Sequence, residues 1–285
     1  MLSLTPHAIK LVSYCEDGED TRHFSFRLLE PHSTMIPEAG QFFMLHVPGA
    51  GAAPFTFTTP PDENGYFSAL IKRMGSVTKA LFRCKTGTIL GARGPFGKGW
   101  PIKEMSGQRI LIVAGGCGLA PLVGLTQTLL DNREYQSLTL LYGAASKSTQ
   151  LLNPERERWR KKIAVYDVVE HRSSEKEEQV ELIGTPVDVL DIVLTKSDKF
   201  PTALLLCGPE IMMRKVALEF INRGLPATSI WLSLERRMHC AVGLCGHCYL
   251  HHNYACKDGP TYRWDQLQSI LPILSETQGS DSLCY

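Results

Sequence analysis

The feature of this sequence that most constrains its fold is a group of four cysteines, in the pattern Cys240-x4-Cys245-x2-Cys248-x7-Cys256. A [2Fe–2S] cluster needs four thiolate ligands, two for each iron, and C-x4-C-x2-C opens the loops that hold such clusters in plant-type ferredoxins. A loop of this kind must curl around its cluster, and Gly243 and Gly246 supply the backbone freedom. The pattern therefore predicts that the four cysteines ligate a [2Fe–2S] cluster.

Zinc is the alternative metal for clustered cysteines. Structural zinc sites made of four cysteines use two pairs, each with a spacing of about two to four residues. Cys248 and Cys256 lie too far apart in the sequence for such a pair. Histidines that flank the loop offer further ligands, although they are ordinary as exposed loop residues: His239, His247, His251 and His252. The spacing favours iron and sulfide over zinc.

The length and charge of the chain limit its function class. The chain has 285 residues, which suggests about two domains with cores that need no covalent staples. Its 30 Lys and Arg residues nearly balance 29 Asp and Glu residues, so there is no basic excess for binding nucleic acid. The sequence has no secretory signal, and its apolar runs are too short to span a bilayer. We therefore expect a cytoplasmic protein with no direct membrane span.

The first hundred residues have the pattern of an antiparallel barrel. Short runs of branched and aromatic residues alternate with turn signals such as Asp17-Gly18 and Asn64-Gly65. The strands expected are 9–12, 21–28, 41–47, 55–59 and 66–72, with a helix at about 77–83. Short antiparallel strands at this spacing are typical of a barrel.

After Pro101 the pattern changes to strands that alternate with helices. Apolar strands are expected at 109–114, 138–142, 164–169, 202–206 and 230–234, with helices at 121–130 and 210–223. This alternation predicts a doubly wound parallel sheet, and the polar segment 172–179 predicts a surface loop. The fold class expected is a β barrel plus an α/β domain and a small C-terminal [2Fe–2S] module. The expected boundaries are 1–103, 104–232 and 233–265, followed by a tail, 266–285.

Two glycine-containing motifs indicate a dinucleotide site. Residues 110–121 read ILIVAGGCGLAP, a buried strand that runs through glycines into a helix, with Pro121 suited to the first helical turn. Such glycines let the backbone approach a pyrophosphate at the helix N-terminus. Cys207-Gly208-Pro209-Glu210 follows a second apolar strand. Ligands bind at the carboxyl ends of parallel strands, so both motifs belong to one predicted site. A glycine turn also occurs for packing alone, and a lone Cys is often a small buried hydrophobe.

The predicted barrel contains three candidate pieces of a flavin site. Residues 54–58 read PFTFT, where Phe55 can cover a flavin ring and Thr56 can form a hydrogen bond to it. Residues 72–78 read KRMGSVT and run from a strand into a helix, whose N-terminus suits a pyrophosphate. Gly94-Pro95-Phe96-Gly97 is expected to end the barrel with a turn. Each piece also has an ordinary structural explanation, and Ser76 is well suited to cap a helix.

The order of these motifs resembles the ferredoxin–NADP reductase superfamily. The added cysteine loop resembles the branch that contains the electron-transfer subunit of dihydroorotate dehydrogenase. Within that branch, residues 234–260 are most similar to the gamma subunits of cytosolic nickel–iron hydrogenases (sulfhydrogenases), and next to the B subunit of anaerobic sulfite reductase. The resemblance covers about residues 8–267. It implies FAD, NAD(P) and a [2Fe–2S] cluster as cofactors.

The resemblance also implies roles for particular residues. The flavin would be lined by Pro54, Phe55 and Thr56, and its ribityl and pyrophosphate would be held by Leu70, Ile71, Lys72, Val77 and Thr78. The dinucleotide pyrophosphate would be received by Gly115, Gly116, Gly118, Leu119 and Ala120. The nicotinamide would be bordered by Cys207, Gly208 and Pro209, with Cys207 as the catalytic residue. The cluster would be ligated by Cys240, Cys245, Cys248 and Cys256.

One departure from the superfamily affects the flavin site. The flavin strand commonly reads Arg-x-Tyr-Ser/Thr, whereas this chain has Ala53 at the Arg position and Phe55 at the Tyr position. Lys72 or Arg73 must then supply more of the phosphate contact.

The function implied is an electron-transfer subunit of a redox complex, working between NAD(P)H and a partner such as a nickel–iron hydrogenase. The alternatives are an anaerobic sulfite reductase partner, or a metal-stabilised docking subunit without flavin, which Ala53 would favour. The sequence does not decide between NAD and NADP as the cofactor. Ser146 and Lys147 are candidates for a contact with the 2′-phosphate of NADP.

Overall fold

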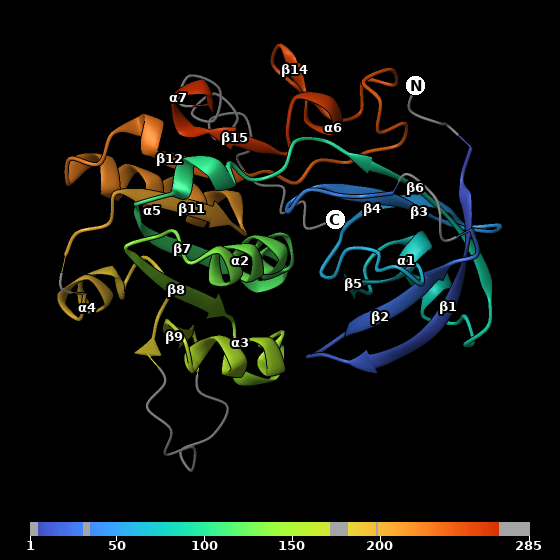
Figure 1. Cartoon of the computed structure of the whole chain (residues 1–285), viewed down its shortest axis with the longest axis horizontal. Coiled ribbons are helices and arrows are strands. Elements are labelled where there is room, and N and C mark those ends of the chain that lie inside the picture. Colours follow the sequence, from blue (N-terminus) through green and yellow to red (C-terminus); the bar gives the residue numbers. More distant parts are fainter. Residues whose placement is uncertain (1–4, 31–34, 172–181, 198, 268–285) are drawn as a thin grey trace.

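The computed structural model describes residues 5–30, 35–171, 182–197 and 199–267. The expected surface loop at 172–179 and the end of the expected tail lie outside these residues. The described chain forms two lobes that lie side by side, with the C-terminal segment across one end of both (Figure 1). Among the helices described, none has the length and apolar character needed to cross a membrane.

The first lobe is a six-stranded antiparallel sheet in the order β4-β3-β6-β1-β2-β5. Its elements are β1 (His7–Glu16), β2 (Thr21–Leu28), β3 (Phe42–Val47), β4 (Gly51–Thr56), β5 (Tyr66–Lys72), α1 (Ser76–Leu81) and β6 (Ile89–Phe96). The edge strands β4 and β5 contact each other, which closes the sheet into a barrel. The interior is aromatic: Phe43 and Phe67 pack edge to face, with ring centroids 5.3 Å apart. The predicted antiparallel barrel is therefore confirmed.

Two barrel strands differ from the prediction. The expected turn at 94–97 is wrong, because Gly94, Pro95 and Phe96 belong to β6, a strand that the sequence did not reveal. Gly and Pro are poor strand formers, so local propensity hid it. Gly94 is needed there because a Cβ on it would lie 3.1 Å from the carbonyl oxygen of Phe42 on β3. Strand β4 also begins earlier than the expected 55–59, since its pairing with β3 starts at Gly51.

The second lobe is a seven-stranded sheet in the order β10-β9-β8-β7-β11-β12-β15. Its strands are β7 (Arg109–Gly115), β8 (Ser137–Ala144), β9 (Ala164–Val169), β10 (Leu182–Ile183), β11 (Ala203–Cys207), β12 (Ile230–Ser233) and β15 (Thr261–Arg263). Its helices are α2 (Ala120–Asn132), α3 (Asn153–Arg160), α4 (Leu190–Thr195) and α5 (Glu210–Asn222). Short 3-10 turns are η1 (Ile102–Met105), η2 (Gly116–Leu119), η3 (Lys147–Thr149) and η4 (Ala227–Ser229).

The parallel sheet is buried on both faces, as predicted for a doubly wound domain. Side chains of α2 and α3 pack in the core on one face, and side chains of α4 and α5 pack in the core on the other. Along β7, Ile112 belongs to the first core and Val113 to the second. This burial on two faces explains why the strand is continuously apolar. Among the strands that the structure describes in this sheet, only β15 runs antiparallel, against β12.

The cysteine-containing segment joins the two lobes. Besides β15, it contains β13 (Tyr249–Leu250), β14 (Asn253–Tyr254), α6 (Ala255–Asp258) and α7 (Trp264–Leu267). Through β15 it extends the sheet of the second lobe, and its loop packs Met238 and Ala241 against Phe42 and Phe96 of the barrel. The segment therefore holds the cysteines against the outside of the barrel. The expected domain boundaries stay a prediction.

Candidate redox site

The cysteine loop turns its backbone N–H groups towards two of its sulfurs. The Sγ atom of Cys240 accepts three such bonds, from the N–H groups of Val242 (3.4 Å), Leu244 (3.3 Å) and Cys245 (3.4 Å). The Sγ atom of Cys256 accepts one, from the N–H group of Gly243 at 3.2 Å. Hydrogen bonds of this kind stabilise a thiolate, and around an iron–sulfur cluster they help to set its reduction potential.

The loop achieves this geometry with left-handed backbone conformations. Gly243 and Gly246 have φ angles of 75° and 80°, which confirms that these glycines curl the loop. Ala241 also has a positive φ of 63°, a conformation that a residue with a Cβ rarely adopts. Strain of this kind persists where the surroundings enforce it, and Ala241 is only 2% exposed between the loop and the barrel. The conformation of the loop is therefore imposed by its packing.

Two of the four cysteines have pKa values that are shifted in opposite directions. The pKa of Cys245 is lowered to about 7, mainly by a backbone hydrogen bond from His247, and a hydrogen bond with the Cys240 side chain contributes. Burial raises the pKa of Cys256 to about 12, and a hydrogen bond with the Cys248 side chain adds to the shift. Across the described ranges, no three His, Cys, Asp or Glu side chains are grouped to hold a single metal ion.

A buried polar atom beside the cysteines also fits a bound cluster. Tyr262 is 3% exposed, and its hydroxyl finds no hydrogen-bond partner among the residues described. Burial is the main cause that raises the pKa of Tyr262, and the negative charges of Asp258, Cys248 and Cys256 add to the shift. An anionic cluster offers acceptor sulfurs to such a donor. The donor set and its surroundings thus fit a [2Fe–2S] group, while the ligand assignment stays a prediction.

The two predicted dinucleotide motifs meet at the carboxyl ends of β7 and β11. These strands are neighbours, with Cys207 opposite Ala114. A Cβ on Gly118 would lie 2.4 Å from the carbonyl oxygen of Cys207, and a Cβ on Gly208 would lie 2.8 Å from the nitrogen of Gly115. The loops therefore touch backbone to backbone, which only glycine allows. Space remains above Gly116, whose φ is +52° and whose Cβ would meet nothing within 4 Å.

The other members of the predicted dinucleotide set form the walls of this loop pair. Leu119 and Ala120 are buried at the start of α2, with Pro121 in its first turn as expected. Pro209 packs closely against Gly115 of the other loop, since a Cβ on Gly115 would lie 2.8 Å from the Cδ atom of Pro209. The free surface of the loops is therefore mostly backbone, as a pyrophosphate site requires.

Cys207, the predicted catalytic residue, is completely buried. Its thiol donates to the carbonyl oxygen of Ser233 on β12 at 3.6 Å, and burial raises its pKa. The side chain therefore packs as a small hydrophobe within the sheet. Its effect on the nicotinamide stays a prediction.

Glu235 is the polar group that the sequence interpretation missed. It lies two residues beyond the end of β12, and its side chain is exposed. Its negative charge adds to the larger effect of burial in raising the pKa values of Cys207 and Cys117, which belong to the two glycine motifs. A signal was available, because an acidic residue just after the last parallel strand lies at the edge where ligands bind.

The predicted flavin residues lie on β4, β5 and α1. Pro54, Phe55 and Thr56 are half-buried on β4, and Val77 of α1 lies beside this strand, 3.7 Å from a Cβ on Gly51. The ring of Phe55 packs on the aromatic interior, with its centroid 6.4 Å from that of Phe43. These side chains are accessible to a ring stacked against the strand.

The remaining flavin residues differ in what they can offer. The side chains of Leu70 and Ile71 are buried, at 7% and 1% exposure, so only their backbone is available to a ligand. Lys72 is exposed, and its positive charge partly opposes the rise in the pKa of Cys117 that burial causes. Ser76 does not cap α1: the N-cap is Gly75, and Thr78 Oγ1 instead accepts the N–H of Met74 at 2.8 Å. The flavin contacts stay predictions.

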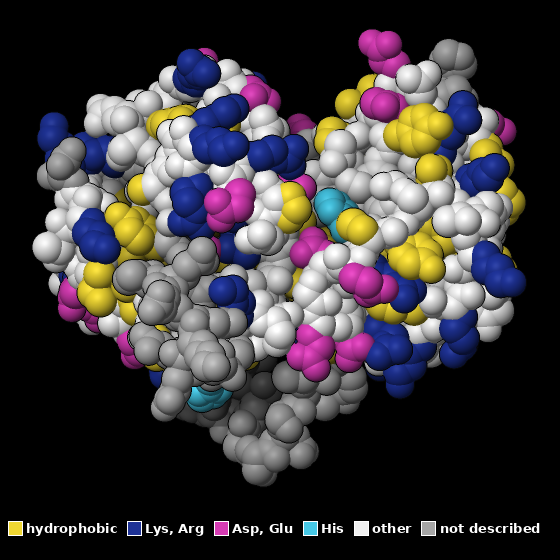
Figure 2. Space-filling model, turned by 90° about the horizontal axis from the view of Figure 1, so that it is seen from below, with side chains coloured by type: hydrophobic (Ala, Val, Ile, Leu, Met, Phe, Trp, Pro, Cys, Tyr) yellow, Lys and Arg dark blue, Asp and Glu magenta, His cyan; other side chains and the backbone are white. Residues whose placement is uncertain are grey.

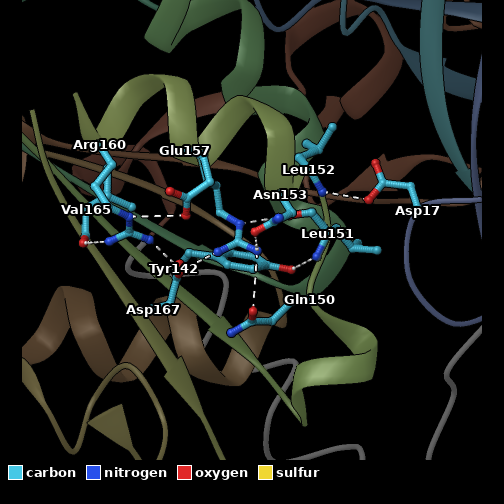
Figure 3. Close-up of polar contacts among 11 residues, drawn as sticks. Asp17, Tyr142, Gln150, Leu151, Leu152, Asn153, Glu157, Arg160, Val165 and Asp167 are labelled. Carbon is cyan, nitrogen blue, oxygen red and sulfur yellow. Dashed lines mark hydrogen bonds and ion pairs between the residues drawn. The ribbon is translucent and has the colours of Figure 1, made fainter. Parts of the chain in front are cut away.

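The loop after β8, which contains Ser146 and Lys147, is fixed from two sides (Figure 3). From within its own lobe, the buried Arg156 donates to the carbonyl oxygen of Leu151 at 2.9 Å and pairs with Asp167. From the barrel, the Asp17 carboxylate accepts the N–H of Leu152 at 2.8 Å. Ser146 forms a capping box with Thr149. The loop that would receive the far end of a dinucleotide is thus held by both lobes.

Comparison with known proteins identifies the three parts of the chain. Residues 8–100 match the family described as oxidoreductase FAD-binding domain, and residues 112–217 match the oxidoreductase NAD-binding domain. Residues 235–268 match the iron–sulfur cluster binding domain of dihydroorotate dehydrogenase B. The third match contains all four clustered cysteines.

Curated relatives resemble almost the whole chain. Sulfhydrogenase 1 subunit gamma of Pyrococcus furiosus is 31% identical over 282 residues, covering 94% of each chain. A probable dihydroorotate dehydrogenase B (NAD(+)) electron transfer subunit of Methanocaldococcus jannaschii is 33% identical and covers 81% of each chain. Among solved structures, a chain of an NADH-dependent reduced ferredoxin–NADP oxidoreductase superposes with a TM-score of 0.74, at 26% identity and 95% coverage of each. The chain therefore belongs to the family that contains the sulfhydrogenase gamma subunits and the electron transfer subunits of dihydroorotate dehydrogenase B.

Proposed function

We propose that this chain is the electron-transfer subunit of a multi-subunit oxidoreductase, working between NAD(P)H and a partner redox enzyme of the nickel–iron hydrogenase type. The observation that carries the proposal is that the barrel, with the candidate flavin residues, contacts the parts of the chain that contain the other two candidate sites. Arg93 of the barrel donates to the Cys240 carbonyl oxygen at 3.4 Å, and Asp17 of the barrel accepts the N–H of Leu152 in the second lobe at 2.8 Å. The similarity to sulfhydrogenase gamma subunits supports the choice of partner.

In this proposal the protein positions its cofactors and shields them. When bound, FAD supplies the exchange between hydride and single electrons, and the [2Fe–2S] cluster supplies single-electron transfer. Backbone N–H groups at the start of α2 would bind the dinucleotide pyrophosphate, because Gly116 leaves that surface open. Phe55 would cover one face of the flavin ring, and Lys72 would contribute charge for a phosphate. Glu235 would accept or donate a hydrogen bond at the nicotinamide end.

The proposal is tested on protein purified without oxygen. It should contain about two irons and two sulfides per chain, as one [2Fe–2S] cluster requires. Acid extraction should release FAD rather than FMN. The chain alone should oxidise NADH or NADPH with a viologen dye as acceptor. Protein that binds zinc and no iron, or that takes up no flavin on reconstitution, would contradict the proposal and favour a docking subunit.

The isolated chain should neither activate hydrogen nor reduce sulfite. Apart from the four clustered cysteines, the sequence has five others, and none of them forms a C-x2-C pair: Cys15, Cys84, Cys117, Cys207 and Cys284. A second metal centre therefore has no ligand set of this type. Turnover of hydrogen or sulfite by the chain alone would overturn the division of labour that we propose.

A second candidate partner is a dihydroorotate dehydrogenase catalytic subunit. The specific observation in its favour is the match of residues 235–268 to the iron–sulfur domain of dihydroorotate dehydrogenase B. Mixing the purified chain with each type of catalytic subunit, and measuring NAD(P)-linked turnover, separates the two. We also propose a cytoplasmic location, because thiolate ligands persist where thiols are kept reduced.

A further inference from the structure

Arg93 is a buried cation between the barrel and the cysteine loop. It lies on β6 opposite Met44 of β3, and it is 7% exposed. Its guanidinium donates from Nε to His46 Nε2 at 2.9 Å and from Nη1 to the Cys240 carbonyl oxygen at 3.4 Å. Its Cζ lies 5.7 Å from the ring centroid of Phe96. One side chain thus contacts two barrel strands and the first predicted cluster ligand.

The direct contacts of Arg93 do not balance its charge. A histidine nitrogen that accepts from Arg93 is neutral, a carbonyl oxygen is neutral, and Phe96 offers only a ring face. Among the ion pairs of the described residues, none contains Arg93. A buried charge without a counter-ion is costly, and an arginine does not escape the cost by losing its proton.

A [2Fe–2S] cluster bound at these cysteines would supply the missing negative charge. Four thiolates and two sulfides outweigh the charge of two ferric ions, and reduction adds one more electron. A nearby cation in a medium of low dielectric therefore stabilises the reduced cluster more than the oxidised one. The contact with Cys240 also ties the loop to β6, so the cation cannot drift from the site.

We propose that Arg93 is a positioning residue that serves as the counter-charge of the cluster and raises its reduction potential. The inference rests on the proposed function, because it requires the cluster to be present. Its consequence is that the barrel, which would hold the flavin, also sets how readily the cluster takes an electron. Arg93 would affect the reduction potential of the cluster through its positive charge and through its hydrogen bond to the Cys240 carbonyl oxygen.

The test is a redox titration of the cluster in the complete chain with its cofactors. Electron paramagnetic resonance monitors the reduced cluster during the titration. Arg93→Gln, which removes the charge, should move the midpoint potential to a more negative value. Arg93→Lys, which keeps the charge, should stay closer to the unmodified protein. Arg27→Gln is the matched control, since Arg27 is exposed on β2, and it should leave the midpoint unchanged.

Variants of His46 provide a second measurement if Arg93→Gln takes up too little iron. His46→Glu places a carboxylate on the same guanidinium, so it should also move the midpoint to a more negative value. His46→Gln keeps a neutral acceptor and should not move it. This pair leaves Arg93 and its contact with the loop in place.

The outcomes distinguish this inference from the proposed function. An unmodified protein without a two-iron signal would contradict the proposed function itself. If the variants contain the cluster and its midpoint potential equals that of the unmodified protein, the role of Arg93 is overturned. The proposed function would then stay intact. Equal shifts for Arg93→Gln and Arg93→Lys would also overturn the role of Arg93, because packing rather than charge would then be the cause.

Discussion

The carboxylate of Asp17 accepts a hydrogen bond from the backbone N–H of Leu152 at 2.8 Å, and this bond joins the two lobes (Figure 3). Asp17 lies in the turn between β1 and β2, and Leu152 lies just before α3. The neighbouring N–H of Glu19 donates to the carbonyl oxygen of Ser148 at 3.0 Å. Seen from below, acidic side chains gather where the lobes meet (Figure 2). The barrel thereby fixes the loop that would receive the far end of the dinucleotide.

Replacement of Asp17 should therefore weaken dinucleotide binding. Asp17→Ala leaves the Leu152 N–H without its acceptor, which should reduce stability by about 1–3 kcal/mol and raise KM for NAD(P)H more than it lowers kcat. Asp17→Asn keeps an acceptor oxygen and should retain most of the affinity. The control is Asp62→Ala, since Asp62 accepts N–H groups within the barrel only, 2.9 Å from Asn64 and 2.8 Å from Tyr66. An equal change of KM in the control would show that general destabilisation is responsible.

Gly118→Ala should abolish productive dinucleotide binding. The added Cβ would lie 2.4 Å from the carbonyl oxygen of Cys207, and backbone on both sides leaves no room for adjustment. We expect loss of NAD(P)H oxidation while FAD and iron contents stay normal, because the glycine loops lie outside the barrel and the cysteine loop. Gly124→Ala on α2 is the control, since its Cβ would be 3.4 Å from the Ala39 side chain. Normal activity in Gly118→Ala would refute the close contact.

Cys248→Ser should remove or strongly weaken the cluster and leave the flavin bound. Cys248 is 1% exposed, and the variant would replace one of the four predicted thiolate ligands with a serine oxygen. Iron and sulfide analysis beside the flavin absorbance gives the result. Cys15→Ser is the control, because Cys15 is exposed in the barrel. Full iron content in Cys248→Ser would remove Cys248 from the ligand set.

The stability of the barrel should fall in mild acid because of His23. Burial lowers the pKa of His23 below 6.5, while the charges of Glu155 and Asp17 partly oppose the shift. Since the depressed pKa belongs to the folded state, the unfolded chain takes up the proton first, and stability falls as the pH drops below 6.5 until the folded pKa is passed.

The His23 prediction is checked by thermal unfolding just above and well below pH 6.5. In the unmodified protein, His23 Nε2 lies 2.7 Å from the Thr58 hydroxyl oxygen. The glutamine side chain of His23→Gln can also form a hydrogen bond with this hydroxyl, but it does not titrate. We expect a smaller loss of thermal stability in acid for this variant. An identical loss in both proteins would assign the acid sensitivity to other groups.

Much of the fold could be predicted because its signals are local. The run 110–114 is continuously apolar and is followed by glycines, so its place in a buried parallel sheet and the turn that follows were both foreseeable. The four cysteines were recognisable because a cluster loop fixes the spacing of its ligands along the chain. Strand β6 could not be predicted, since its Gly94 and Pro95 contradict strand propensity, and the strand depends on the pairing of its other residues with β1 and β3.

What the sequence by itself determined is the order of the parts: antiparallel strands, a glycine turn in a parallel sheet, and a cysteine loop. The tertiary structure decided how these parts meet. Arg93 and Cys240 are 147 residues apart, and Asp17 and Leu152 are 135 apart, yet each pair is in contact. Residue spacing and secondary-structure propensity describe only residues near each other in the chain. The contact of Arg93 with Cys240 and the hydrogen-bond partner of Asp17 depend instead on packing between distant segments. The roles of Arg93 and Asp17 were therefore visible only in the folded structure.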